Sequence, residues 1–134
     1  MELESLAERA HPKRTPSYSF RLKSKAGLLV PDLDPMLEAL ARDAASGLHP
    51  SLVARGFQDC LVRVMVRVTM ELSEQSKLNR VVLSGGVFNN RYITRKVSLN
   101  LRRGGLKVYT HRQVPPGDGG LSLGQAVVAA QAEL

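Results

Sequence analysis

The residues best suited to chemistry lie in the glycine-rich segment 84–90, which reads SGGVFNN. The segment follows a short apolar run, Val81–Leu83, which predicts a buried strand, and it leads into a helical pattern. Ligands of open α/β sheets bind beyond the carboxyl ends of strands, where glycines admit close approach and the next helix offers free N–H groups to phosphate. The segment is neither a Walker A loop nor a GxGxxG motif. From the pattern alone, a ligand-binding loop and a bare tight turn are therefore equally good interpretations.

A second segment of this kind, VPPGDGG at residues 114–120, also lies between an expected strand and an expected helix. Its aspartate, Asp118, could ligate a metal or cap the helix, and capping is the commoner role. His111 stands alone, without a partner at metal-binding spacing, which favours a structural role. Cys60 lies on an apolar helical stripe, which favours a core position over a nucleophile. Because metal sites normally take three or more protein ligands, we expect any metal site built from this chain to be incomplete.

The elements that must position these two segments follow one another over residues 80–134. Strands are expected at 81–83 and 106–110, and helices at 90–103 and 121–133. Strand, helix, strand, helix with short connections is the pattern of a parallel sheet covered by helices.

The preceding part of the chain is mainly helical in pattern, with helices expected at 1–10, 35–46 and 50–75. The longest of these has an apolar side, which consists of Val53, Phe57, Leu61, Val64, Val68 and Leu72. Residues 11–30 read as a variable loop or insertion with short strands at 18–22 and 27–30. We expect residues 1–134 to form a single α/β domain.

Composition narrows the class of protein further. Apolar residues make up 43% of the chain, an ordinary share for one globular core, whereas aromatic residues are scarce at 4%. No apolar run is long enough for a membrane span, and the amino terminus lacks the layout of a signal peptide, so we expect a cytoplasmic protein that does not contact membranes. The net charge of +7 could attract nucleic acid or acidic partners. Because the basic residues look scattered and not interleaved with aromatics, we expect a solvated or domain-facing surface and no nucleic-acid partner.

The two glycine-rich segments together resemble a known family. The stretches SGGVFNNR at 84–91, YTHR at 109–112, VPP at 114–116 and DGGLSLGQA at 118–126 look like the C-terminal signature of the HypF carbamoyltransferases. Order, spacing and flanking strands agree over about 50 residues, and weaker similarity reaches back to Met1. The resemblance therefore covers nearly the whole chain, and the loop at 11–30 carries it least.

The resemblance implies a fold and an activity. Members transfer a carbamoyl group from carbamoyl phosphate, through a carbamoyl-adenylate, to the C-terminal cysteine of the partner protein HypE, for the cyanide ligands of [NiFe]-hydrogenase. Their last domain is similar to the TsaD tRNA-modification proteins and has an actin-like ATPase (ribonuclease-H-like) fold. The implied fold is thus the second lobe of such a domain, a small mixed sheet flanked by helices.

The resemblance also implies site residues, taken position by position. Gly85, Gly86, Val87 and Asn90 would contact the nucleotide, ATP or carbamoyl-adenylate. Asp118 would ligate a divalent metal (Mg, Fe or Zn) beside two histidines. Either Glu2 or Glu4 would match the acidic residue that meets the ribose.

Departures from the family pattern matter as well. The family usually has Gln where Asn89 stands and Asn where Gly117 stands, and either change could loosen a loop. Full members are several times longer, and the two metal-binding histidines are missing here. We therefore expect a piece of a larger enzyme, inactive alone, whose partners are the rest of the enzyme and a HypE-like acceptor; exposed apolar surface would also favour a homodimer. The alternatives are a non-enzymatic nucleotide- or partner-binding module and a basic nucleic-acid-binding relative of the TsaD family.

Overall fold

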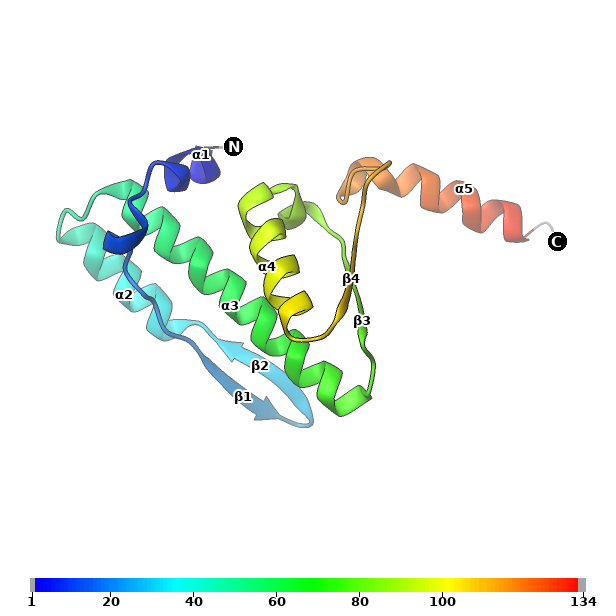
Figure 1. Ribbon diagram of the computed structural model, residues 1–134, viewed down its shortest axis with the longest axis horizontal. Helices are drawn as coiled ribbons and strands as arrows, with labels where there is room; N and C mark the ends of the chain where they lie inside the picture. Colours follow the sequence, from blue (N-terminus) through cyan, green and yellow to red (C-terminus); the bar gives the residue numbers. More distant parts are fainter. Residues whose placement is uncertain (1, 133–134) are drawn as a thin grey trace. The chain divides into compact units, whose positions relative to one another are not determined.

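The computed structural model describes residues 2–132, and the chain divides into two compact units, Met1–Leu78 and Asn79–Leu134. The first unit contains three helices, a hairpin and a short turn of 3-10 helix (Figure 1). Its elements are α1 (Glu2–Glu8), the 3-10 turn η1 (Pro12–Arg14), β1 (Arg21–Lys25), β2 (Leu28–Asp32), α2 (Asp34–Ala45) and α3 (Pro50–Ser76). The three helices expected from the periodicity are confirmed, with ends shifted by one or two residues.

The two short strands expected within residues 11–30 are present as the hairpin of β1 and β2, with shifted ends. The two strands pair antiparallel from Arg21 opposite Asp32 to Lys25 opposite Leu28. Ala26 and Gly27 both have positive φ, of 50° and 78°, the backbone that a two-residue hairpin turn with right-handed strand twist requires. The strand predicted at 18–22 was wrong in its start, because Tyr18 is buried in the core and its carbonyl oxygen accepts a hydrogen bond from Arg63 of α3.

Helix α3 is the centre of the first unit, and more of its circumference is buried than one apolar stripe predicts. α1 packs on it, and so do α2 and the hairpin. The buried positions include Ala54, Gly56 and Gln58, none of which lies on the predicted stripe, whereas Leu72 of that stripe is 48% exposed. Elements on more than one side of α3 explain this difference.

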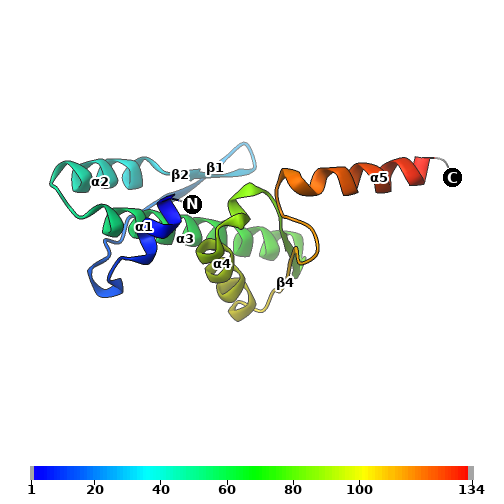
Figure 2. The same cartoon turned by 90° about the horizontal axis from the view of Figure 1, so that it is seen from above.

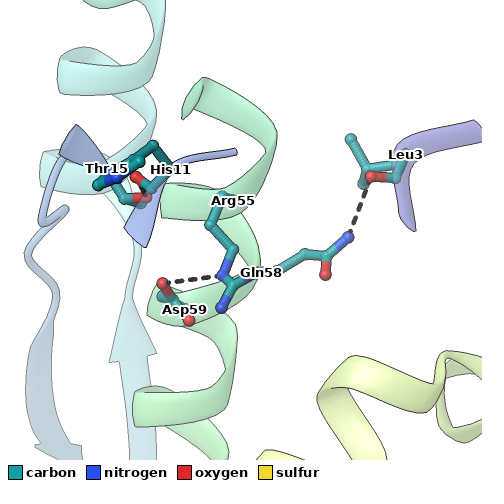
Figure 3. Close-up of polar contacts among 6 residues, drawn as sticks. All are labelled: Leu3, His11, Thr15, Arg55, Gln58 and Asp59. Atoms are coloured by element: carbon teal, nitrogen blue, oxygen red, sulfur yellow. Dashed lines mark hydrogen bonds and ion pairs between the residues drawn. The ribbon is translucent and has the colours of Figure 1, made fainter. Parts of the chain in front are cut away.

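Two side chains of α3 show how that packing is made. Gln58 is fully buried, and its Nε2 donates to the carbonyl oxygen of Leu3 at 3.2 Å, which ties α1 to α3 (Figure 3). Cys60 is fully buried in one cluster with Tyr18, Met36 and Val64. Burial raises the pKa of its thiol, so the expected core role of Cys60 is confirmed.

Tyr18 gives the first unit a dependence on alkaline pH. Burial first, and then the carboxylate of Asp43, raise the pKa of Tyr18 to about 12. Between pH 10 and pH 12 the unfolded chain has lost this proton while the native state retains it, so the free energy of unfolding falls as pH rises through that window. We expect a loss of up to about 2–3 kcal/mol from this group.

Urea denaturation at pH 9 and pH 11.5 checks this expectation. The Tyr18→Phe variant has no phenol to ionise at this position, so it should lose less stability over the same interval than the parent. An equal loss in both proteins would assign the effect to the lysines and to the other tyrosines.

The second unit has a strand, helix, strand and helix in the predicted order (Figure 1). Its elements are β3 (Arg80–Leu83), the 3-10 turn η2 (Gly86–Asn89), α4 (Arg91–Arg103), β4 (Lys107–Thr110), the 3-10 turn η3 (Asp118–Gly120) and α5 (Leu121–Ala132). Strands β3 and β4 are parallel, as the pattern predicts. In the described residues the strands form two separate two-stranded sheets, β1–β2 and β3–β4, and not one mixed sheet.

Helix α4 supplies the core of the second unit and α5 does not. Ile93, Val97 and Leu101 of α4 are at most 3% exposed. By contrast, α5 extends away from the β3–β4 sheet in both views (Figures 1 and 2), and Val127 and Val128 are 56% and 70% exposed. α5 carries no charged residue, so it offers an uncovered apolar surface. No helix within residues 2–132 has the length and apolar character that crossing a bilayer requires.

Candidate functional site

The two glycine-rich segments meet at one edge of the β3–β4 sheet. The register pairs Leu83 with Thr110, so the two parallel strands end side by side. The segments that follow them, 84–90 and 111–120, therefore leave the sheet at the same edge. This is the edge at which parallel sheets bind ligands.

Hydrogen bonds join the two loops directly. The backbone N–H of Gly85 donates to the carbonyl oxygen of Pro116 at 2.7 Å. The hydroxyl of Ser84 lies 3.4 Å from the same oxygen and 3.1 Å from Nε2 of His111. His111 thus bonds within the loop pair, which fits the structural role expected for it.

The first loop needs glycine for two different reasons. Gly85 has a φ of 106°, which L side chains rarely adopt. Gly86 has an ordinary φ, and a Cβ built on it would meet no atom within 4 Å. Gly86 begins the 3-10 turn η2, whose first N–H groups have no partner inside the turn. The open space beside Gly86 therefore lies next to backbone donors.

The two positions that depart from the family pattern are neighbours. A Cβ on Gly117 would lie 3.3 Å from the Cα of Gly86 and 3.4 Å from Nδ2 of Asn89. Gly117 is extended, with φ −99°, so its glycine serves close approach between the loops and not an unusual backbone. Asn89 is shorter than the glutamine usual in the family, and Gly117 has no side chain, so the two loops can approach each other closely at this point.

Asp118 and Asn90 both lie at the start of a helical element: Asp118 is the first residue of η3, and Asn90 directly precedes α4. Asp118 is exposed and opens η3 after the second loop. Asn90 is the N-cap of α4, because its Oδ1 accepts from the N–H of Ile93 at 3.0 Å. The side-chain oxygen of Asn90 therefore already has a structural partner, and a nucleotide contact there would use its Nδ2.

The described residues do not fit a complete metal centre. No group of three or more His, Cys, Asp or Glu side chains gathers anywhere in residues 2–132. Asp118 is the only carboxylate among residues 79–132 that the structure describes, and the Nε2 of His111 lies 3.1 Å from the hydroxyl of Ser84. A resident metal would need ligands beyond these residues.

Glu2 and Glu4 lie in the first turn of α1, in the other unit. The assignment of either carboxylate to a ribose stays a prediction.

Sequence reasoning missed a second feature of this unit, a basic hollow of about 470 Å³ along α4. Arg91, Arg95 and Arg102 line it together with Thr94, Ser98 and Thr110, and with the apolar side chains of Phe88 and Leu99. The signal was present in the sequence: positions 91, 95, 98 and 102 follow one another at steps of four, three and four, which places them on one face of a helix.

Comparison with known proteins gives a consistent result. Residues 1–125 match the family model described as carbamoyltransferase, Kae1-like domain, second subdomain. The chain is 39% identical over 102 residues to carbamoyltransferase HypF2 of Cupriavidus necator, and 28% identical over 115 residues to carbamoyltransferase HypF of a Synechocystis species. These matches cover 75% and 86% of the chain but only 12% and 14% of the two relatives.

A solved structure agrees with the sequence matches. A crystal structure of full-length HypF in a phosphate- and nucleotide-bound form superposes with a TM-score of 0.85 at 34% identity. The match covers 98% of this chain and 17% of that one. The α/β fold expected from the sequence, one lobe of an actin-like domain, is confirmed.

Proposed function

This chain belongs to the HypF carbamoyltransferase family, and on that premise we propose that its joined loops bind the nucleotide part of ATP or carbamoyl-adenylate. The observation that carries the proposal is the hydrogen bond from Gly85 to Pro116, which unites two glycine-rich loops at the carboxyl edge of parallel strands. Such edges bind ligands, and the first N–H groups of η2 suit phosphate oxygens.

The role of each site residue follows from its position. The N–H groups of Gly86 and Val87 would bind phosphate oxygens, and Gly85 would keep the loop in its turn. Asn90 would hold the start of α4 beside the nucleotide through its cap. Backbone dipoles aimed at the reacting group would stabilise charge on the carbamoyl oxygen during transfer, as preorganised donors do in acyl transfer.

The whole reaction is proposed for the complete enzyme and not for this chain alone. The chain covers 12% of the HypF2 relative, so the remaining domains would supply carbamoyl phosphate chemistry and the surface for a HypE-like acceptor cysteine. Asp118 would contribute one ligand to a divalent ion (Mg, Fe or Zn), with histidines from outside the chain. Alone, the chain would bind nucleotide without turnover.

The second unit exposes apolar side chains, which supports the proposal that another part of the complete enzyme covers them. Val82 and Tyr109 are 66% and 52% exposed on the two strands, and α5 is apolar and uncovered. Apolar surface of this extent marks an interface. We propose that the first subdomain of the complete enzyme covers it, with a homodimer as the competing arrangement.

Isothermal titration calorimetry of the purified chain with ATP and magnesium tests the nucleotide site. We expect binding in the micromolar range, because the two loops are already joined within this unit. Magnesium without ATP should give no comparable heat, since the described residues hold no complete metal site. A folded chain that gives no heat at millimolar ATP would show that these loops do not form a nucleotide site by themselves.

A further inference from the structure

The positive charge of the chain is concentrated in one unit. Residues 79–134 contain eight Lys and Arg residues but two Asp and Glu residues, whereas residues 1–78 contain eleven and ten. Helix α4 alone has five basic residues and no acidic one. Basic residues are therefore nearly balanced by acidic ones in the first unit and are in clear excess in the second.

Three of the five basic residues of α4 gather on one side of the helix. Arg91, Arg95 and Arg102 line the hollow beside α4, and the span from the first to the last is about 16 Å at the rise of an α-helix. Arg91 and Arg95 are one turn apart, and like charges at this spacing destabilise a helix by about 0.2–0.5 kcal/mol. Arg102 donates through Nη2 to the carbonyl oxygen of Val108 at 3.2 Å, and a guanidinium has four further N–H donors.

The opposite side of α4 is committed to the core. Ile93, Val97 and Leu101 are 3%, 1% and 0% exposed. A helix that lies on a lipid surface must present an apolar face to the acyl chains. α4 has no such face left, so its basic side suits an aqueous polyanion and not a membrane.

We propose that this basic side of α4 binds the phosphate backbone of single-stranded RNA. Protein–protein interfaces are depleted of charge at their centres, whereas interfaces with nucleic acid are polar and strongly positive. All three basic residues that line the hollow are arginines, whose planar groups pair with phosphate in a bidentate manner.

The hydroxyl groups in the hollow favour RNA over DNA. Thr94 and Thr110 lie among the arginines, whereas Ser98 is 6% exposed. The hydroxyl of Thr94 donates to the carbonyl oxygen of Phe88 at 2.8 Å and keeps its acceptor lone pairs for the donor of a ribose 2′-hydroxyl. None of Gly85, Gly86 and Val87 lines the hollow. Phe88 of the first loop does line it, so RNA would bind beside the proposed nucleotide site through different side chains, and this inference goes beyond the proposed function.

Fluorescence anisotropy of a labelled oligouridine of about 20 nucleotides, with the full chain, tests the proposal. We expect the affinity to fall steeply as the salt concentration rises. Each phosphate contact contributes about 0.7 to the slope of log K against log salt, so changing Arg91, Arg95 and Arg102 together to Gln should reduce the slope by about two. Affinity at low salt should fall at least about tenfold in this variant. The variant should remain folded by circular dichroism, because it removes a like-charge pair.

The matched control removes the same charge elsewhere. Lys13, Arg14 and Lys25 are exposed in the first unit, and their joint replacement by Gln should leave RNA affinity within about threefold, since none of them lies on α4 or lines the hollow. If this control weakens binding as much as the α4 variant, net charge and not the α4 surface is responsible, and the proposal fails. It also fails if oligothymidine DNA or a polyglutamate peptide of equal charge binds as tightly as the RNA.

Discussion

Replacing Gly86 with valine should abolish ATP binding by this chain while leaving its fold intact. The substitution adds three carbon atoms in the space beside Gly86, where a Cβ meets no protein atom within 4 Å. The φ of Gly86 lies in the range that any residue adopts, so the backbone need not move. The new side chain instead occupies the side from which a phosphate would approach the N–H groups of η2.

The expected loss is large because the displaced contacts are charge-assisted. Hydrogen bonds to a charged group contribute about 1.5–3 kcal/mol each, so losing two of them weakens binding by about 100-fold or more. Calorimetric titration with ATP and magnesium should show micromolar heat for the parent and none for Gly86→Val, with unchanged far-UV circular dichroism for both.

Gly124→Val is the control for the nucleotide experiment. Gly124 also has nothing within 4 Å of a built Cβ, but it lies on α5 outside the two loops. Its variant should bind ATP like the parent. If Gly86→Val bound ATP with parental affinity, the loop would be a tight turn after all and the nucleotide assignment would be wrong.

The largest effect on stability is expected at Gly56, in the middle of α3. A Cβ there would lie 2.8 Å from the carbonyl oxygen of Pro16 and 2.8 Å from Cε2 of Tyr18. Distances this short cannot be kept, and one of the two neighbours is backbone. Gly56→Val should therefore push the 16–18 segment off α3 and destabilise the first unit by about 3 kcal/mol or more.

Urea denaturation followed by circular dichroism measures this loss, and Gly124→Ala provides the comparison. In the open helix α5, alanine replaces glycine without a clash and should stabilise by up to about 1 kcal/mol through helix propensity alone. Should Gly56→Val also leave the unfolding midpoint unchanged, the close packing of residues 16–18 on α3 would be incorrect.

Some features of this protein could be predicted from neighbouring residues alone. The strand–helix–strand–helix order of residues 80–134, the long helix α3 and the two glycine-rich loops all follow from periodicity and from turn residues within a few positions. The same motifs identified the family. These signals are local, so they can be recognised without knowledge of the fold.

Features that depend on distant partners could not be predicted in the same way. The turn at Ala26 and Gly27 was missed because alanine is not a usual residue for positive φ. Burial of Gly56 and Gln58 depends on segments at Pro16 and Leu3, which sequence spacing does not place beside α3. A one-sided helix was therefore expected where several elements pack around it.

The candidate site also combines features that the sequence predicts with features that depend on the fold. The sequence by itself determined which residues stand at the two strand ends, because strand and loop propensities are local. Only the tertiary structure decided that the N–H of Gly85 meets the oxygen of Pro116, 31 positions away, since parallel register brings Leu83 beside Thr110. It also decided that the basic side of α4 faces water: the opposite side of the same helix forms the core, and one helix cannot bury both.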